Sequence, residues 1–251
     1  MVDSPIEHGM GSRWAAGRVL GSVGIVSDVP DDGVYGPLPP WLRRTRTSLD
    51  SRPALYPVGM PDEALLETTV DRKVIHTGRY LTFHVDTIAD AQGRRHTREL
   101  VDHPGAVAVL ALDDGELLMV RQYRTPIGRI LLEIPAGTLD RLPDGSLEDP
   151  ADAAPRELAE ETGHAAATWR RLGRFYTAPG FASEEMHLFL ATGLAPVPGY
   201  TGPDEDERLE LCRVPWADAV ELAEAGDVED AKSILGLFWL DRLIRRGDVV
   251  P

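Results

Sequence analysis

A short acidic run at residues 155–163 constrains this chain more than any other feature. The run holds Arg156 together with three glutamates, namely Glu157, Glu160 and Glu161. On an α-helix, residues three and four apart lie side by side, so each such pair of like charges destabilises an isolated helix by roughly 0.2 to 0.5 kcal/mol. Arg156 relieves only part of this repulsion. A divalent cation held by carboxylate oxygens would turn the repulsion into a binding site, and the alternative is a solvated acidic face.

Two prolines leave the start of this helix open. If the helix began at Pro150 with Asp149 as its cap, Pro155 would lie in the interior, where a proline costs about 3 kcal/mol. A start near Ala153, capped by Asp152, would place that proline in the first turn. We expect the late start or a kink, and either leaves the glutamates helical.

The spacing around the acidic run resembles the signature box of the Nudix hydrolases. Gly137 is followed by ten residues, Glu148, seven residues, and then Arg-Glu-Leu-x-Glu-Glu-x-Gly ending at Gly163. The family has five residues after the first glycine, so five are extra here, within or near residues 140–145. Their Pro-Asp-Gly core is typical of a surface turn. Every position from Glu148 to Gly163 fits, although His164 replaces a hydrophobic residue, and we interpret the extra residues as a loop insertion that leaves the helix intact.

Other segments resemble the ADP-ribose pyrophosphatase branch of this family. Pro179 lies sixteen residues after Gly163, as does the proline marker of that branch, and a simple strand-ending turn is the alternative reading. Residues 131–137 and the acidic residues 204–207 are also similar. The resemblance spans roughly residues 70–245 and does not reach the amino-terminal segment.

This resemblance implies Mg²⁺-dependent hydrolysis of the diphosphate bond of ADP-ribose to AMP and ribose 5-phosphate, with Mn²⁺ as an alternative cation. Two other functions stay open. The substrate could be another nucleoside diphosphate sugar, or the domain could bind ADP-ribose as a sensor without cutting it. The intact glutamates argue against the sensor, because a pure binder has no need for mutually repelling carboxylates.

The resemblance also implies a set of metal ligands with carbonyl or carboxylate oxygens: Ala136 through its carbonyl, Glu157, Glu160, Glu161 and Glu207. Of these, Glu157 and Glu161 would be the main ligands and part of the catalytic centre. Arg156 would orient the carboxylates by ion pairing, and Glu148 would be a weaker ligand or a structural residue.

In this branch, the general base is a glutamate on a loop outside the box. The matching loop is residues 202–208, where four acids cluster. We expect Glu205 to be the base and Glu207 to be a metal ligand, since both would project to the same side of an extended segment. A solvated charge run is the alternative, and a base must also reach the water that it deprotonates.

Substrate contacts follow from the same resemblance. Arg98 and Arg124 match arginines that contact the diphosphate or neighbouring groups in related enzymes, and the guanidinium fork suits that task. Ordinary surface ion pairing is the alternative for each. Ser183 is a candidate near the terminal ribose. Tyr80 and Phe83 are candidates for stacking on adenine, or else sheet packing.

Charge and composition restrict the partners. The formal net charge of -15 argues against nucleic acid or an anionic membrane as a partner, so bound cations and local arginines must reverse the field for a phosphorylated substrate. Cys212 is the only cysteine, which excludes an internal disulfide and suits a reducing cytosol. No apolar run is long enough to cross a membrane, and no signal peptide is convincing. We expect a cytoplasmic protein.

The predicted fold is α/β (α+β), a Nudix-type α/β/α sandwich with a mixed sheet, preceded by a small antiparallel sheet. Residues 1–65 would form an extended or partly disordered arm, residues 66–103 the small sheet and residues 104–251 the catalytic domain. Family members often dimerise through the amino-terminal sheet. A homodimer is therefore expected, in which Arg98 could act across the interface.

Hydrophobic alternation predicts a hairpin of residues 80–85 and 95–102, joined by a turn at residues 90–93. Further strands are expected at residues 107–112, 116–123, 130–134, 169–176, 186–191 and 209–214. Two helices are expected at residues 216–225 and 230–245. The apolar side chains of the second helix predict that it buries Leu235, Phe238, Trp239 and Leu243.

Overall fold

The computed structural model describes residues 62–202 and 208–251. The chain divides into two units, residues 1–61 and 62–251, and the second is described here by itself. The predictions for residues 1–61 and for Glu205 and Glu207 lie outside the described residues. Among the described residues, no helix is both long enough and apolar enough to span a membrane.

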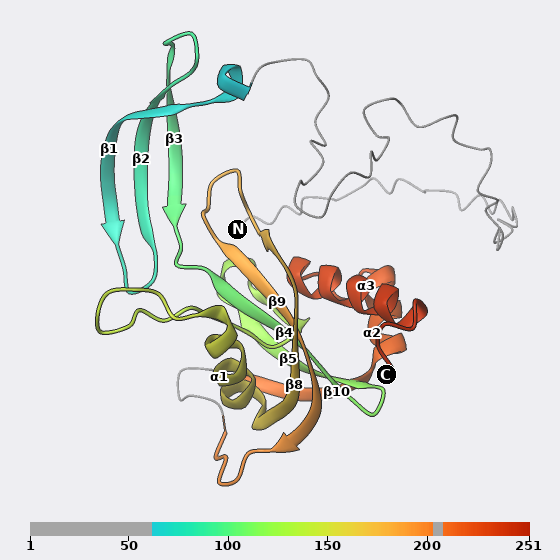
Figure 1. Cartoon of the computed structure of the whole chain (residues 1–251). Helices are drawn as coiled ribbons and strands as arrows, with labels where there is room; N and C mark the ends of the chain where they lie inside the picture. Colours follow the sequence, from blue (N-terminus) through green and yellow to red (C-terminus); the bar gives the residue numbers. More distant parts are fainter. Residues whose placement is uncertain (1–61, 203–207) are drawn as a thin grey trace, which may run out of the picture. The chain divides into compact units, whose positions relative to one another are not determined.

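A seven-stranded sheet forms the centre of the described unit (Figure 1). Its main path runs through β10 (Leu209–Pro215), β5 (Glu116–Arg124), β4 (Ala106–Asp113), β9 (Glu185–Pro196) and β8 (His164–Tyr176). Two short strands extend it, β6 (Arg129–Glu133) beside β5 and β7 (Ala136–Thr138) beside β4. Strands β4 and β9 pair in parallel and β4 and β5 pair antiparallel, so the sheet is mixed.

Helices cover both faces of this sheet (Figure 1). Helix α1 (Pro150–Thr162) lies on one face, and α2 (Trp216–Ala225) and α3 (Ala231–Arg245) lie on the other. Strand β4 is buried on both sides: Val107 and Val109 pack with Leu158 of α1, whereas Ala108 and Leu110 pack with α2 and α3. A continuous apolar run of this kind is typical of a strand that is covered on both faces. The predicted α/β/α sandwich is confirmed.

The predicted buried face of α3 is wrong in part. Leu243 is buried, but Leu235 and Phe238 are 38% and 42% exposed. The helix instead approaches the sheet through Gly236, where an added Cβ would lie 3.3 Å from the Leu110 side chain. Leu237 and Leu240 are fully buried together with Leu243. Large apolar side chains occur on more than one side of this helix, so their spacing alone fits more than one face, and the close approach at Gly236 selects the buried one.

A separate three-stranded antiparallel sheet precedes the large one. Its order is β1 (Thr68–Thr77), β2 (Thr82–Ala89) and β3 (Arg95–Asp102), and a 3-10 turn at Asp62–Leu65 leads into it. The predicted hairpin corresponds to β2 and β3, whose registered pairs begin with Thr82 opposite Asp102, and it is confirmed. Every residue of β1 is exposed.

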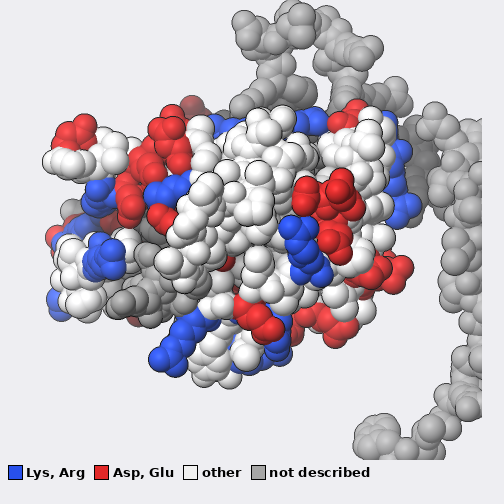
Figure 2. All heavy atoms as spheres, turned by 90° about the horizontal axis from the view of Figure 1, so that it is seen from below, with Lys and Arg blue, Asp and Glu red and all other residues white. Residues whose placement is uncertain are grey.

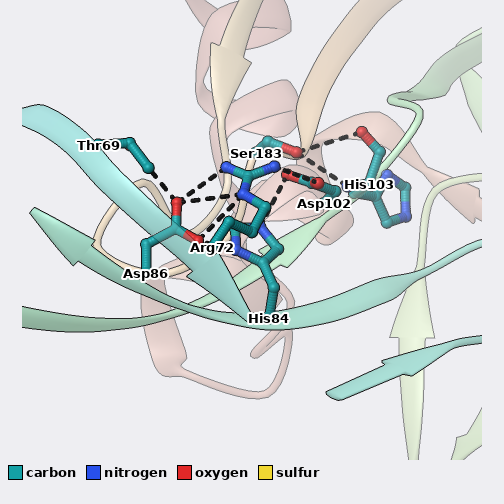
Figure 3. A network of polar contacts seen from close by, with 7 residues as sticks. All are labelled: Thr69, Arg72, His84, Asp86, Asp102, His103 and Ser183. Atoms are coloured by element: carbon teal, nitrogen blue, oxygen red, sulfur yellow. Dashed lines mark hydrogen bonds and ion pairs between the residues drawn. The ribbon is translucent and has the colours of Figure 1, made fainter. Parts of the chain in front are cut away.

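The middle strand of this small sheet buries polar groups (Figure 3). His84 and Asp86 are both fully buried. Arg72 on β1 donates to Asp86 through Nε at 3.0 Å and Nη2 at 2.9 Å, and its Nη1 lies 3.4 Å from Asp102. The hydrogen bond from Arg72 lowers the pKa of Asp86 despite its burial. Ion pairs of Arg72 with Asp86 and Asp102 therefore connect the three strands of this sheet.

Candidate active site

Helix α1 begins at Pro150, not near Ala153. The Asp149 side chain caps it by accepting from the Ala151 nitrogen at 2.8 Å, and Pro155 lies inside the helix. The predicted late start is wrong, because a capping aspartate followed by proline at the first helical position forms a favourable start. Pro155 removes one backbone hydrogen bond of the kind that an interior residue makes.

The residues before the helix form the predicted surface loop. Leu142 donates from its backbone nitrogen to the Ser146 carbonyl at 2.9 Å, and the Ser146 nitrogen donates to Asp144 Oδ1 at 2.9 Å. Residues 141–147 are exposed, and the Glu148 nitrogen donates to the Asp140 carbonyl at 2.9 Å to close the loop. The predicted surface loop and the intact helix after it are confirmed, and the interpretation of the extra residues as an insertion stays a prediction.

Arg156 lies at the centre of the acidic run and contacts three carboxylates. Its Nη2 donates to Glu148 at 2.7 Å, and its Nη1 donates to Glu157 and to Glu160, each at 2.8 Å. The hydrogen bond between Arg156 and Glu148 raises the pKa of the arginine and lowers that of the glutamate. The positive charge of Arg156 therefore offsets part of the repulsion between these carboxylates, and its hydrogen bonds orient them.

The backbone of β7 lies directly against α1. The Ala136 nitrogen donates to Glu161 Oε2 at 3.0 Å, and both Glu157 and Glu161 are buried. A Cβ on Gly137 would lie 1.9 Å from the Glu157 carboxyl carbon, closer than any real contact. Glycine is therefore required at this position for the backbone to approach the carboxylate.

A cavity of about 310 Å³ opens beside these carboxylates. Four of the predicted metal ligands line it: Ala136, Glu157, Glu160 and Glu161. Arg124, the last residue of β5, lines it as well, and so do Arg79 and Tyr80 from the turn between β1 and β2. The cavity thus combines oxygen donors for a cation with guanidinium groups for an anion and an aromatic ring.

Two predicted substrate contacts lie elsewhere. Arg98, on β3, donates through Nε to Glu67 at 3.3 Å. Ser183 accepts from the His103 nitrogen at 2.8 Å and donates to the His103 carbonyl at 3.3 Å, beside the charged network of the small sheet (Figure 3). Neither is among the described residues that line the cavity.

Glu133 and Lys232 lie beside the site although neither was predicted as a site residue. Arg124 makes a bidentate contact to Glu133, which is 1% exposed, and the Lys232 ammonium contacts the same carboxylate. The one indication in the sequence was Glu133 itself, a single charged residue in the otherwise apolar segment 130–134. Both residues line a second cavity of about 410 Å³, which shares Arg124, Ala136, Gly137 and Thr138 with the first.

In the described part of the chain, no three histidine, cysteine or acidic side chains converge as a preformed metal cluster. Arg156 contacts the carboxylates of Glu157 and Glu160 in this arrangement. The donor set is still the kind that a hard divalent cation prefers, since it consists of carboxylates beside a backbone strand. By their chemistry, the residues fit such an ion.

Charges on the surface are mixed. On the face shown in Figure 2, acidic side chains gather in clusters with basic side chains beside them, and uncharged residues cover the centre. The net charge of -15 is thus accompanied by local basic groups, and Arg79, Arg124 and Arg156 line the carboxylate cavity, where they can offset it.

Comparison with known proteins fits this arrangement. Residues 102–237 match the family model described as NUDIX domain. The chain belongs to the NUDIX family. An ADP-ribose pyrophosphatase of Bacillus subtilis (strain 168) is 40% identical to this Nudix hydrolase over 179 residues, covering 71% of this chain and 94% of its own. The predicted family is confirmed.

Two further similarities point to the same branch. An ADP-ribose pyrophosphatase of Mycobacterium tuberculosis (strain ATCC 25618 / H37Rv) is 38% identical over 170 residues, covering 67% of this chain and 80% of its own. A solved structure described as an ADP compounds hydrolase superposes with a TM-score of 0.61 at 26% identity, covering 73% of this chain and 97% of that chain. The predicted branch of the Nudix family is confirmed by these relatives.

Proposed function

We propose that this Nudix hydrolase cleaves the diphosphate bond of ADP-ribose and releases AMP and ribose 5-phosphate. The observation that carries the proposal is the cavity of about 310 Å³ in which Glu157 and Glu161 lie with Arg124 and Tyr80. Carboxylates suit a cation, the guanidinium suits a phosphate and the ring suits a base. The similarity to two ADP-ribose pyrophosphatases supports the choice of nucleotide.

The proposed cofactor is Mg²⁺, with Mn²⁺ as an alternative. Its ligands would be the Ala136 carbonyl, Glu157, Glu160, Glu161 and Glu207. When bound, such an ion neutralises diphosphate oxygens and makes a bound water more acidic. The side chain of Glu160 is 40% exposed and that of Glu157 is 8% exposed, which favours a supporting role for Glu160.

Glu205 remains the proposed general base, and this part of the proposal rests on the resemblance to the branch. The substrate contacts have more structural support. Glu133 accepts from Nε and Nη2 of Arg124, and Nη1 makes no hydrogen bond to any of the described residues, so we propose that it donates to an anion. Tyr80 is 43% exposed with the Arg79 guanidinium 4.7 Å from its ring centroid, so we propose that its ring stacks on the adenine.

We propose a homodimer formed through the small sheet. Strand β1 exposes three apolar residues, Val70, Val74 and Ile75, which favour burial against another surface. Arg98 and Ser183 would then contact substrate from this assembly, Arg98 from the partner chain. A single cysteine in the whole chain also supports a cytoplasmic location.

The proposed function is tested by a screen of nucleoside diphosphate derivatives with Mg²⁺ and a coupled phosphatase that detects the monophosphate products. ADP-ribose should be turned over by the wild type, and Glu161→Gln should reduce turnover more than about 100-fold, because even outer-shell partners of a metal are worth about 10- to 100-fold. Glu210→Gln, at an exposed pair with Arg121, is the matched control and should leave turnover unchanged.

Two outcomes would redirect the proposal. If the wild type binds ADP-ribose but hydrolyses no compound, the protein is a sensor. If it prefers another nucleoside diphosphate sugar, such as GDP-mannose, the substrate changes while the reaction stays the same.

A further inference from the structure

We propose that Glu133 and Lys232 are positioning residues of this hydrolase and that they act through Arg124. The inference rests on the proposed function, in which Arg124 contacts the diphosphate. It assigns a role to a buried ion cluster that joins the end of β6 to the beginning of α3, two segments about a hundred residues apart in the chain.

The contact between Arg124 and Glu133 fixes the plane of the guanidinium. Nε donates to Oε1 at 2.7 Å and Nη2 donates to Oε2 at 2.6 Å, so two parallel hydrogen bonds join the groups. The Glu133 side chain is 1% exposed, whereas that of Arg124 is 39% exposed. Arg124 is therefore anchored on its buried edge and can donate to a ligand from the remaining nitrogen.

Lys232 keeps the anchor charged. Its ammonium contacts Glu133 Oε2 and lies 3.0 Å from Asp230 Oδ2, and its side chain is 8% exposed. Burial raises the pKa of Glu133, but the hydrogen bond from Arg124 and the charge of Lys232 outweigh it and leave that pKa below its usual value. The carboxylate thus stays ionised and able to accept both hydrogen bonds from the arginine.

The cluster is itself fixed by backbone contacts. Asp230 caps α3 and accepts from the Ser233 nitrogen at 2.9 Å, and the Ser233 hydroxyl accepts from the Ile134 nitrogen at 2.9 Å. Ile134 follows β6 and leads within two residues to Ala136, on the wall of the carboxylate cavity. Hydrogen bonds therefore connect the start of α3 to the residues that follow β6 and lead to the cavity wall.

Stability alone does not account for this cluster. Buried ion pairs contribute little net stability compared with apolar residues of similar volume. Arg124, however, lines both the cavity with the box carboxylates and the adjoining cavity that contains Lys232. A guanidinium whose orientation is fixed before binding loses less freedom when it contacts a phosphate, so the cluster would favour substrate binding.

A double-mutant cycle tests this role. Glu133→Gln is combined with Arg124→Ala, and kcat and KM for ADP-ribose are measured with Mg²⁺. Alone, Glu133→Gln should raise KM about 10- to 100-fold with a smaller change in kcat. In the Arg124→Ala background, it should change neither, because its effect passes through the arginine. Lys232→Met should follow the same pattern, and Lys232→Arg should retain most of the affinity because it keeps the charge.

Controls separate positioning from folding. Glu229 lies just before α3 and forms an exposed ion pair with Arg129, in which Oε1 and Nη2 are 2.7 Å apart. Glu229→Gln removes this pair and should leave KM unchanged. If the fold-changes in KM caused by Glu133→Gln and Arg124→Ala multiply in the double variant, the two residues act independently and the positioning role is wrong. Lys232→Met takes the place of Glu133→Gln in the cycle if that variant does not fold.

The same cycle also distinguishes this inference from the proposed function. If the wild type hydrolyses no nucleoside diphosphate, the proposed function fails, and the cycle is then read from equilibrium binding of ADP-ribose in EDTA. Non-additive losses of affinity would still support positioning. Additive losses, or none, would overturn it.

Discussion

The two sheets of the described unit are stabilised by different kinds of side chain. In the seven-stranded sheet, β4 buries an uninterrupted apolar run between α1 and the pair α2 and α3. In the three-stranded sheet, the middle strand buries His84 and Asp86, while β1 is exposed along its whole length. The large sheet therefore depends on apolar burial, whereas the small sheet buries little apolar side chain beyond Ile88 and relies more on ion pairs.

This difference bears on function. Among the described residues, the apolar core on both faces of β4 contains no titratable side chain, so we expect the packing of β4 against α1 to depend little on pH. The small sheet contributes Arg79 and Tyr80 to the edge of the same cavity. We therefore expect the position of that edge to depend on the ion pairs within the small sheet.

The largest expected effect is on the core of the large sheet. Leu110 is fully buried against α2 and α3, so Leu110→Ala should lower the free energy of unfolding by about 2 to 5 kcal/mol. Thr97→Ala, at an exposed residue of β3, should change it by less than about 0.5 kcal/mol. Urea unfolding measures both, and similar losses would refute the contrast between the sheets.

The next effect is on the contact between β7 and α1. Gly137→Ala should lower kcat/KM for ADP-ribose about 100-fold, because the methyl group would displace the Glu157 carboxylate and such displacements cost about that much. Gly180→Ala is the matched control, since an added Cβ there meets no atom within 4 Å. Steady-state kinetics decide. Equal activity in the two variants would show that this close approach does not matter for the site.

A pH experiment sharpens the comparison further. The pKa of Asp86 is lowered in the folded protein, so its stabilising contribution is present above the ordinary carboxyl value of about 4 and is lost as the pH falls through the folded value. On acidification below about pH 4, β2 should lose protection against hydrogen exchange before β4 does.

Asp86→Asn should weaken the protection of β2 already at neutral pH and leave less further loss on acidification. Exchange is followed by mass spectrometry and corrected for the intrinsic pH dependence of the rates. Loss of protection at one common pH in both strands would contradict the view that only the small sheet depends on charge.

The smallest expected effect concerns the start of α1. Asp149→Ala should cost about 1 kcal/mol of stability, the usual value for a lost helix cap, and Asp152→Ala should cost less. Urea denaturation of the two variants gives the comparison. A larger loss of stability from Asp152→Ala than from Asp149→Ala would indicate that Asp152 caps the helix and that α1 begins near Ala153.

Much of the fold was accessible from local patterns. Alternation and turn residues predicted the hairpin of β2 and β3, and the Pro-Asp-Gly core predicted the surface loop at residues 140–145. The start of α1 was not predicted correctly, because the cost of Pro155 was weighed above the favourable cap at Asp149. Local rules of similar magnitude compete there, and tertiary packing decides between them.

By itself, the sequence determined the register of the acidic box and most of the helices and strands, since these depend on neighbours within a few residues, but it indicated neither β1 nor β7 as a strand. Only the tertiary structure decided that α3 buries Leu237 and Leu240 beside the close approach at Gly236 and that Lys232 contacts Glu133, 99 residues away in the chain. Contacts between distant segments depend on how whole elements pack, and side-chain spacing within one segment carries no record of them.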